Sequence, residues 1–111
     1  MIDIIDVGRV AALNDILRRS LTGGTLVLTA GVVALGRERQ QTILDAIAAF
    51  DRFEPDDDSY GERDFGAVEA AGERIFWKIE YFDRSRARAS PDPADTSVTE
   101  RVLTILLAVE Y

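Results

Sequence analysis

In the stretch RIFWKIEYF, residues 74–82, every second residue is a large apolar or aromatic one, and all the charged residues fall at the positions between them. Because successive side chains of a β-strand point to opposite faces of a sheet, this alternation predicts a strand with one face in the core. The predicted core side chains are Ile75, Trp77, Ile79 and Tyr81. The other face carries Arg74, Lys78 and Glu80 together with Phe76 and Phe82. A loop or a partner would have to cover those two phenylalanines.

The residues before this strand complete a predicted hairpin. Residues 65–70 form a second strand, and Ala71-Gly72 supplies the two-residue turn. Glycine readily takes the positive φ that such turns require. The short stretch TLVLT, residues 25–29, is rich in β-branched side chains and predicts a further strand. The apolar residues 30–35 either extend that strand or turn away from it.

Two helices are predicted in the first half of the chain. In residues 7–21 the apolar side chains recur every three or four positions, which is the stripe of an amphipathic helix. Asp6 is its expected N-cap, and Gly23-Gly24 is its expected stop. Residues 37–50 repeat the same helical period. The arginines of the first helix are expected off the stripe, in solvent: Arg9, Arg18 and Arg19.

A third helix is predicted near the C-terminal end. Residues 83–96 contain two prolines, which favour irregular structure. Ser97 and Glu100 then have the spacing of a capping box, followed by residues that are apolar around most of a helix. The predicted order is helix, strand, helix, hairpin, helix, in a single α+β domain covering residues 1–111. Its small, mostly antiparallel, three-stranded sheet has the helices packed on one face.

The composition narrows the class of protein. The chain of 111 residues has a formal net charge of −7 and contains neither histidine nor cysteine. The missing residue types exclude the usual serine and cysteine triads, conventional structural zinc sites and a disulfide framework. No apolar run approaches the length that spans a bilayer, and a cytoplasmic location is expected. The acidic balance argues against direct binding to nucleic acid, which needs clustered Lys and Arg, and permits a basic protein partner.

Most of the negative charge lies in residues 51–64, DRFEPDDDSYGERD, which carry seven carboxylates and two arginines. Pro55 and Gly61 mark this segment as a loop. Two interpretations are open, an exposed acidic surface that binds a partner or a loop of oxygen ligands for a metal. The candidate partner-binding residues are Asp56, Asp57, Asp58, Tyr60, Glu62 and Asp64.

The metal interpretation rests on a partial calcium-loop pattern. Asp56, Asp58 and Gly61 occupy positions one, three and six of the template. The match fails at position five, which is Tyr60, and at position twelve, which is Ala67 where a bidentate acid is needed. Asp56 and Asp58 are therefore only weak metal candidates, and no cofactor is expected.

A second charged loop follows the hairpin and carries Arg84, Arg86 and Arg88. Since the acidic segment enters the hairpin and this loop leaves it, we expect both at the same end of the sheet. Either the two loops pair with each other, or one or both face a macromolecular partner. Exposed ion pairs between the loops would add only ~0–1 kcal/mol each to the stability.

Five strings occur in the order TLVLTAGV, DDDSYGERDFGAVE, FWKIEYFD, SPDPAD and TERVLTILLAVEY. Together they resemble a bacterial family catalogued as a domain of unknown function, DUF3768, over nearly the whole chain. The resemblance implies a small protein often encoded on plasmids and other mobile elements, with no assigned activity. Asp58, Gly61, Glu62 and Asp64 match the loop pattern of that family. Arg63 stands where the family tends to have histidine, and an arginine cannot replace histidine as a ligand or a base.

These features predict a non-enzymatic, cytoplasmic interaction protein whose acidic loop binds a basic partner. The mobile-element setting that the resemblance implies suggests a more specific form, an anti-restriction or anti-CRISPR inhibitor that occupies a nucleic-acid-binding surface. Two alternatives remain open. One is a divalent-cation-binding protein or metal-dependent hydrolase that uses the carboxylates of residues 51–64. The other is a structural homodimer that self-associates through Phe76 and Phe82.

Overall fold

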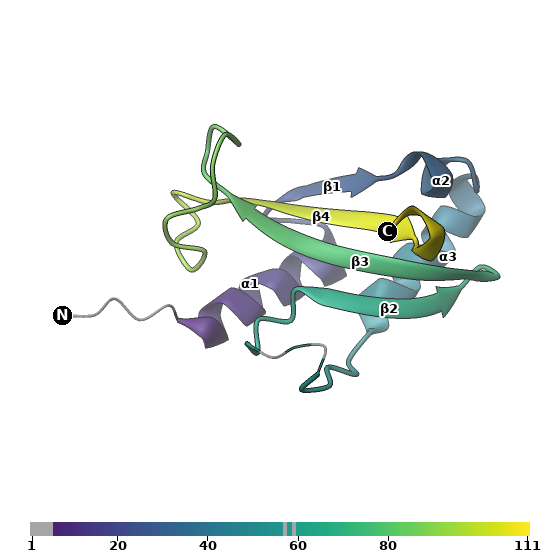
Figure 1. The fold of residues 1–111 in the computed structure, drawn as a ribbon, viewed down its shortest axis with the longest axis horizontal. Helices are drawn as coiled ribbons and strands as arrows, with labels where there is room; N and C mark the ends of the chain where they lie inside the picture. The colour runs from purple at the N-terminus through teal and green to yellow at the C-terminus, as the bar shows by residue number, and fades with distance from the viewer. Residues whose placement is uncertain (1–5, 57, 59) are drawn as a thin grey trace.

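The computed structural model describes residues 6–56, 58 and 60–111. Its elements in chain order are α1 (Val7–Ser20), β1 (Thr25–Leu28), α2 (Ala30–Val33), α3 (Arg37–Ala49), β2 (Phe65–Ala70), β3 (Glu73–Phe82), β4 (Glu100–Leu107) and the 3-10 turn η1 (Ala108–Glu110). The strands form a four-stranded sheet in the order β1-β4-β3-β2 (Figure 1). β1 runs parallel to β4, and the other two neighbouring pairs are antiparallel. The fold is therefore α+β with a mostly antiparallel sheet.

The predicted hairpin is confirmed, with its turn at the predicted residues. β2 pairs with β3 along its whole length. Ala71 and Gly72 both have positive φ, 54° and 77°, as in the type I′ turn that suits the twist of a hairpin. Trp77 in the middle of β3 stands opposite Gly66 on one side and Ile105 on the other. The centre of β3 is therefore enclosed by two neighbouring strands.

The predicted C-terminal helix is wrong, because these residues form the strand β4. β4 lies between β1 and β3 and is largely buried, and an apolar run without alternation suits such a central strand as well as a buried helix. Its β-branched residues Val102, Thr104 and Ile105 favour the extended form. Glu100 begins the strand and accepts a hydrogen bond from Thr25 Oγ1 (3.0 Å) instead of closing a capping box. The sheet therefore has four strands rather than three.

Both helices predicted in the first half of the chain are confirmed. α1 begins after Asp6, whose carboxylate accepts a hydrogen bond from the Arg9 backbone N–H (3.0 Å). It ends at Ser20, before the glycine pair, because the C-cap residue Leu21 takes the left-handed conformation that closes the helix. α2 turns the chain away from β1, so residues 30–35 do not extend that strand. No helix in the described part of the chain has the length and apolar character needed to cross a membrane.

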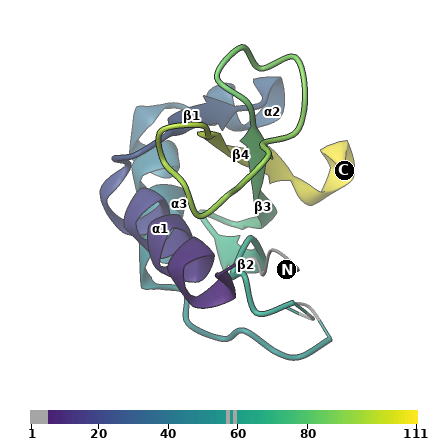
Figure 2. The same ribbon diagram turned by 90° about the vertical axis from the view of Figure 1, so that its left-hand side faces the viewer.

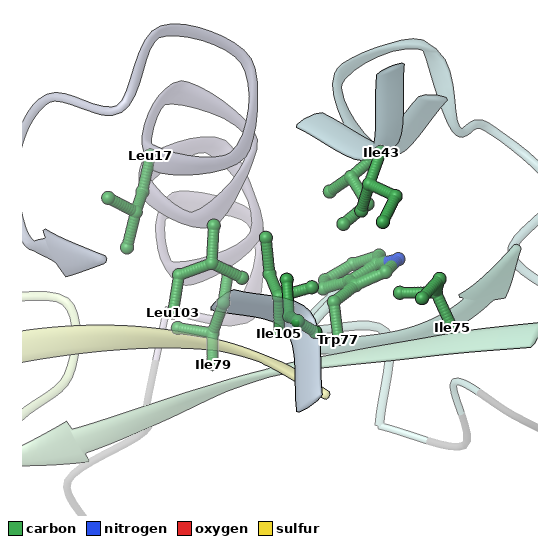
Figure 3. Close-up of a cluster of buried hydrophobic side chains, with 9 residues drawn as sticks. Leu17, Ile43, Ile75, Trp77, Ile79, Leu103 and Ile105 are labelled. Atoms are coloured by element: carbon green, nitrogen blue, oxygen red, sulfur yellow. The ribbon is translucent and has the colours of Figure 1, made fainter. Parts of the chain in front are cut away.

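The hydrophobic core lies between α1, α3 and one face of the sheet, as predicted for the helices (Figure 2). Figure 3 shows Leu17 of α1 and Ile43 of α3 above the strand side chains Ile75, Trp77, Ile79, Leu103 and Ile105. Phe50 and Phe53, at and after the end of α3, pack edge-to-face on Trp77 with ring centroids 5.7 and 6.1 Å away. The acidic segment thus starts from a position fixed by the core.

The chain itself covers part of the opposite face of the sheet. Phe76 contacts Phe65 of β2 and Tyr111, with ring centroids 5.7 and 5.3 Å apart. Phe82 is half-buried and forms an isolated β-bridge with Ala89 of the following loop. The two phenylalanines therefore have intramolecular neighbours.

Candidate functional site

The acidic loop, residues 51–64, joins α3 to β2 and presents some of its side chains to solvent. Tyr60 is 80% exposed. Asp51, Glu54 and Asp56 are exposed as well. We call these four residues the outer group. Asp57, which the sequence also predicted as partner-binding, lies outside the described residues.

Arg18 anchors the start of the loop from beneath. Only 1% of this residue is exposed, so the expectation that all three arginines of α1 lie in solvent is wrong for Arg18. Its Nη1 donates to the carbonyl oxygens of Ile47 (2.7 Å) and Phe50 (2.7 Å) at the end of α3. Carbonyl groups at a helix C-terminus have no partners within the helix. Arg18 satisfies them and fixes the point where the loop begins.

Asp15 joins this anchor to the far end of the loop. One of its carboxylate oxygens accepts a hydrogen bond from Arg18 Nη2 (2.8 Å), and the other pairs with Arg63 Nη1 (3.0 Å). Both guanidinium groups also lie over the ring of Phe53, with Cζ at 5.3 Å for Arg18 and 5.0 Å for Arg63 from its centroid. Cation–π contacts add to the ion pairs. The loop is thus attached to α1 at both residues 53 and 63.

Hydrogen bonds within the loop turn Asp58 inward. Its carboxylate accepts a hydrogen bond from the Arg63 N–H (2.9 Å), and its carbonyl oxygen accepts one from the Gly61 N–H (3.0 Å). Gly61 has a φ of 72°, which its lack of a Cβ permits. Asn14 Nδ2 of α1 donates to the carbonyl oxygen of Glu62 (3.0 Å). Asp58 therefore shapes the loop and is only partly exposed.

Glu62 and Asp64 form an inner cluster with Tyr81 at the margin of the core. Burial raises the pKa of the Glu62 carboxyl, and the nearby Asp64 raises it further, while a hydrogen bond with Tyr81 opposes the rise. Burial also raises the pKa of Asp64. The pKa of the Tyr81 hydroxyl is raised by burial as well, against the hydrogen bond that it accepts from Asn14 Nδ2 (2.7 Å). Both carboxyl groups therefore hold protons more tightly than ordinary surface acids.

Arg101 of β4 connects the inner cluster to the second charged loop. Its Nε donates to Asn14 Oδ1 (3.0 Å), and its guanidinium lies over the ring of Tyr81 (5.3 Å). Its Nη2 donates to the carbonyl oxygen of Pro93. Burial lowers the pKa of Arg101. A connected network of this kind fixes the acidic loop relative to the sheet.

The second charged loop is held by its own neighbours. Arg84 and Arg86 each pair with Glu100, at 3.2 Å in both cases. Arg86 also donates to Thr25 Oγ1 (2.8 Å), and Arg88 is exposed. The acidic loop enters β2 at the end of the hairpin from which the second charged loop leaves β3, but the two loops lie beside opposite edges of the sheet (Figure 2). No ion pair joins them among the residues that the structure describes, so Arg84 and Arg86 stabilise their own loop.

The metal interpretation gains no support from the structure. Within residues 6–56, 58 and 60–111, acidic side chains nowhere gather in a group of three that could hold a metal ion. Asp56 is exposed, whereas the carboxylate of Asp58 is bonded to the Arg63 backbone. The two weak metal candidates therefore have different surroundings.

The sequence predicted the loop but missed the side chains that hold it. Those side chains are Asn14, Asp15, Arg18 and Arg101. The sequence contained an indication for two of them. Asn14 and Arg18 are four residues apart, so they share a helix face, and they lie on either side of Leu17 on the buried side of α1. Arg101 carried no usable signal, since the segment containing it was predicted as a helix.

Comparison with known proteins gives one match. The family model described as "Protein of unknown function (DUF3768)" matches residues 28–110. No curated protein and no solved structure matches the chain. The matched residues include the whole acidic loop and strands β2 to β4.

Proposed function

The chain belongs to the DUF3768 family, and from the geometry of its acidic loop we propose that it is a protein-binding module for a basic partner. The observation that carries the proposal is Tyr60, 80% exposed on a loop that Arg18 and Arg63 hold to α1 near its two ends. Tyrosine is enriched among the residues that dominate binding energy. The other three residues of the outer group add negative charge to the same loop.

The attachment of the loop to α1 favours binding. An ordered loop loses less conformational entropy on association than a loose one. Arg18, Asp15 and Arg63 supply that order through the contacts with the end of α3 and with Phe53. The negative charge then speeds encounter with a basic surface, and added salt weakens this effect.

The partner class that suits this surface is a protein with clustered lysine and arginine, such as one that handles nucleic acid. In the most specific form of this proposal, the protein is a cytoplasmic inhibitor of a host-defence enzyme, of the anti-restriction or anti-CRISPR kind. The acidic loop would compete with the phosphate backbone for the same basic groups. The net charge of −7 supports this form, because it keeps the chain itself away from nucleic acid.

Capture of partners from a bacterial lysate, with identification by mass spectrometry, tests the proposal. The test variant carries Asp51→Asn, Glu54→Gln and Asp56→Asn, and a second variant carries Tyr60→Ala. All four side chains are exposed, so both variants are expected to fold. We expect one stoichiometric partner with the wild-type chain and its loss with either variant.

The matched control neutralises three exposed acids of α3 and the hairpin, through Glu38→Gln, Asp45→Asn and Glu80→Gln. It has the same net charge as the triple loop variant and should retain the partner. A partner captured equally by the control and by both loop variants would contradict the proposal. Capture of no partner above background by the wild-type chain would contradict it as well.

No specific observation favours either alternative, the divalent-cation-binding protein or the structural homodimer. The carboxylates that would bind a divalent cation are dispersed among the described residues, with some exposed and others bonded to the chain itself. Phe76, which a self-association surface would use, already packs against Phe65 and Tyr111.

A further inference from the structure

β2 is an edge strand, because in the order β1-β4-β3-β2 it has a neighbour on one side only. The carbonyl oxygen of Asp64, just before β2, accepts a hydrogen bond from the Ile79 N–H (2.8 Å). Antiparallel pairs alternate between bonded and non-bonded positions, so Gly66, Val68 and Ala70 are the residues that exchange hydrogen bonds with β3.

The N–H and C=O groups of Phe65, Ala67 and Glu69 therefore point away from the sheet. Outside the β2–β3 ladder, no hydrogen bond reaches these groups from any residue that the structure describes. Edge strands are commonly protected by proline, lysine or a bulge. β2 contains neither proline nor lysine, and its single charged side chain, Glu69, is paired with Arg74 (2.9 Å). This edge is open to a further strand.

An aromatic groove of about 450 Å³ follows the same edge. Phe50 and Phe53 line it from the side of the helices, and Phe65 and Phe76 line it from the opposite face of the sheet. Gly66 lies between the two pairs and contributes no side chain. A strand placed along β2 would direct alternate side chains into this groove.

Trp77 lies in the core behind Gly66, which is one of the residues that line this groove. Its side chain is fully buried, and its indole N–H has no hydrogen-bond partner within the described part of the chain. Figure 3 shows this nitrogen at the end of the ring that points away from Ile105. It lies against Gly66, where an added Cβ would be 2.5 Å away. An unpaired buried donor is therefore directed at the strand that lines the groove.

The charge beside the groove indicates the kind of ligand. The acidic loop leads directly into β2, and Glu54 of its outer group lines the groove itself. Two arginines also line it: Arg74 is paired with Glu69, and Arg52 belongs to the acidic loop, whose seven carboxylates outnumber its two arginines. We propose that the β2 edge and this groove bind an extended, basic segment of the partner, which adds to the sheet as a fifth strand. The inference rests on the proposed function, because it names the form in which a basic partner meets the acidic loop.

A synthetic peptide of alternating lysine and valine with one central phenylalanine is the probe. It is titrated into the ¹⁵N-labelled chain, and amide signals and hydrogen exchange are followed by NMR. We expect the amides of Phe65, Ala67 and Glu69 to shift and to exchange more slowly. The amides at 66, 68 and 70, already bonded to β3, should change little. This alternation of protected residues is the signature of strand addition.

Two controls separate strand addition from charge attraction. Ala67→Pro removes one outward N–H and leaves the β2–β3 ladder in place, because Ala67 makes no ladder bond. The variant loses that hydrogen bond, and the proline ring keeps the peptide from lying close to β2, so peptide binding should weaken about tenfold. The second control keeps the wild-type chain and uses the same peptide N-methylated at alternate residues, which cannot pair as a strand. It should bind far more weakly whatever the stability of the proline variant.

Equal binding of the methylated and unmethylated peptides would overturn the inference, as would the absence of any shift at residues 65, 67 and 69 at millimolar peptide. A dimer in sedimentation that Ala67→Pro abolishes would assign the edge to a second copy of this chain and overturn it too. Once a partner is captured, its loss with the outer-group variants but not with Ala67→Pro would leave the proposed function standing and reject strand addition. Loss with Ala67→Pro alone would reject the acidic loop as the contact.

Discussion

A buried arginine is the residue on which the position of the acidic loop depends most. Arg18 donates to carbonyl oxygens at the end of α3 and to Asp15, and it lies over the rings of Phe53 and Trp77. Removing a guanidinium from water has a large cost, which close hydrogen bonds and an ion pair offset. The sequence places Arg18 next to the apolar stripe, but only the fold brings the end of α3 within reach.

Arg18→Leu should lower the free energy of unfolding by about 3 kcal/mol, because it removes the buried guanidinium that donates to carbonyl oxygens at the end of α3 and to one of the two carboxylate oxygens of Asp15. Urea unfolding followed by the emission of Trp77, the single tryptophan, measures the change. Arg19→Leu is the matched control, since Arg19 is the exposed neighbour on the same helix and should change the stability by no more than about 0.5 kcal/mol. Similar losses for both variants would show that the buried contacts of Arg18 contribute little.

At the scale of elements, the hairpin has a turn residue that is not the best one for its conformation. Ala71 has a φ of 54°, a region in which a Cβ approaches the following carbonyl oxygen. Gly72 beside it takes the same region without that contact. The hairpin therefore forms in spite of Ala71, because β3 is held in the middle of the sheet.

Ala71→Gly should raise the free energy of unfolding by about 0.5 kcal/mol, since relief of the left-handed strain exceeds the added entropy of the unfolded chain. Ala70→Gly is the matched control. Ala70 has extended backbone at the end of β2, so the same substitution should there lower the stability by about 1 kcal/mol. Urea unfolding of the two variants compares them directly, and effects of the same sign would contradict the argument from backbone conformation.

Contrast between two faces decided which elements were predictable from the sequence. α1, α3 and β3 each place one side against the core and another toward solvent, so their apolar residues repeat with the period of the element. β4 lacks this contrast, because Val102 and Leu103 point to opposite faces and both are buried. Its parallel pairing with β1 joins residues far apart in the chain, such as Thr25 and Val102. Local sequence carries no signal for such a pairing.

The same reasoning applies to the candidate site. Proline, glycine and the density of carboxylates predicted a loop at residues 51–64, and the structure has that loop. Which acids face solvent depends instead on hydrogen bonds within the loop and on side chains from α1 and β3. Asp58 binds the Arg63 backbone, and Glu62 lies near Tyr81, while Asp56 stays exposed. Acids adjacent in sequence therefore differ in burial for reasons that only the tertiary contacts contain.

At the scale of the whole molecule, the acids fall into two groups with opposite effects on stability. Hydrogen bonds hold the pKa of four carboxyl groups below their ordinary values: Asp83, Asp95, Glu100 and Glu110. Burial instead raises the pKa of Glu62 and Asp64 above their ordinary values of 4.5 and 3.8. The first group favours folding when ionised, and the second group favours folding when protonated.

The stability of the wild-type chain should therefore be greatest in mildly acidic solution. The four carboxyl groups with lowered pKa values stabilise the folded state at pH values above their ordinary pKa values. This stabilisation is lost as the pH falls through their pKa values in the folded state. For Glu62 and Asp64 the folded state binds protons more tightly than the unfolded state, so the free energy of unfolding decreases as the pH rises through the raised pKa values. Urea unfolding at a series of pH values between about 3 and 8 gives the profile.

The double variant Glu62→Gln, Asp64→Asn removes the two raised groups and should flatten the decline on the neutral side of the profile. Its matched control is Asp51→Asn, Glu54→Gln, which makes the same change in net charge on the exposed part of the same loop. The control separates burial from general repulsion, because loss of two negative charges weakens self-repulsion equally in both variants. A decline that persists in the inner-cluster variant but disappears in the control would mean that net charge, and not burial beside Tyr81, sets the pH dependence.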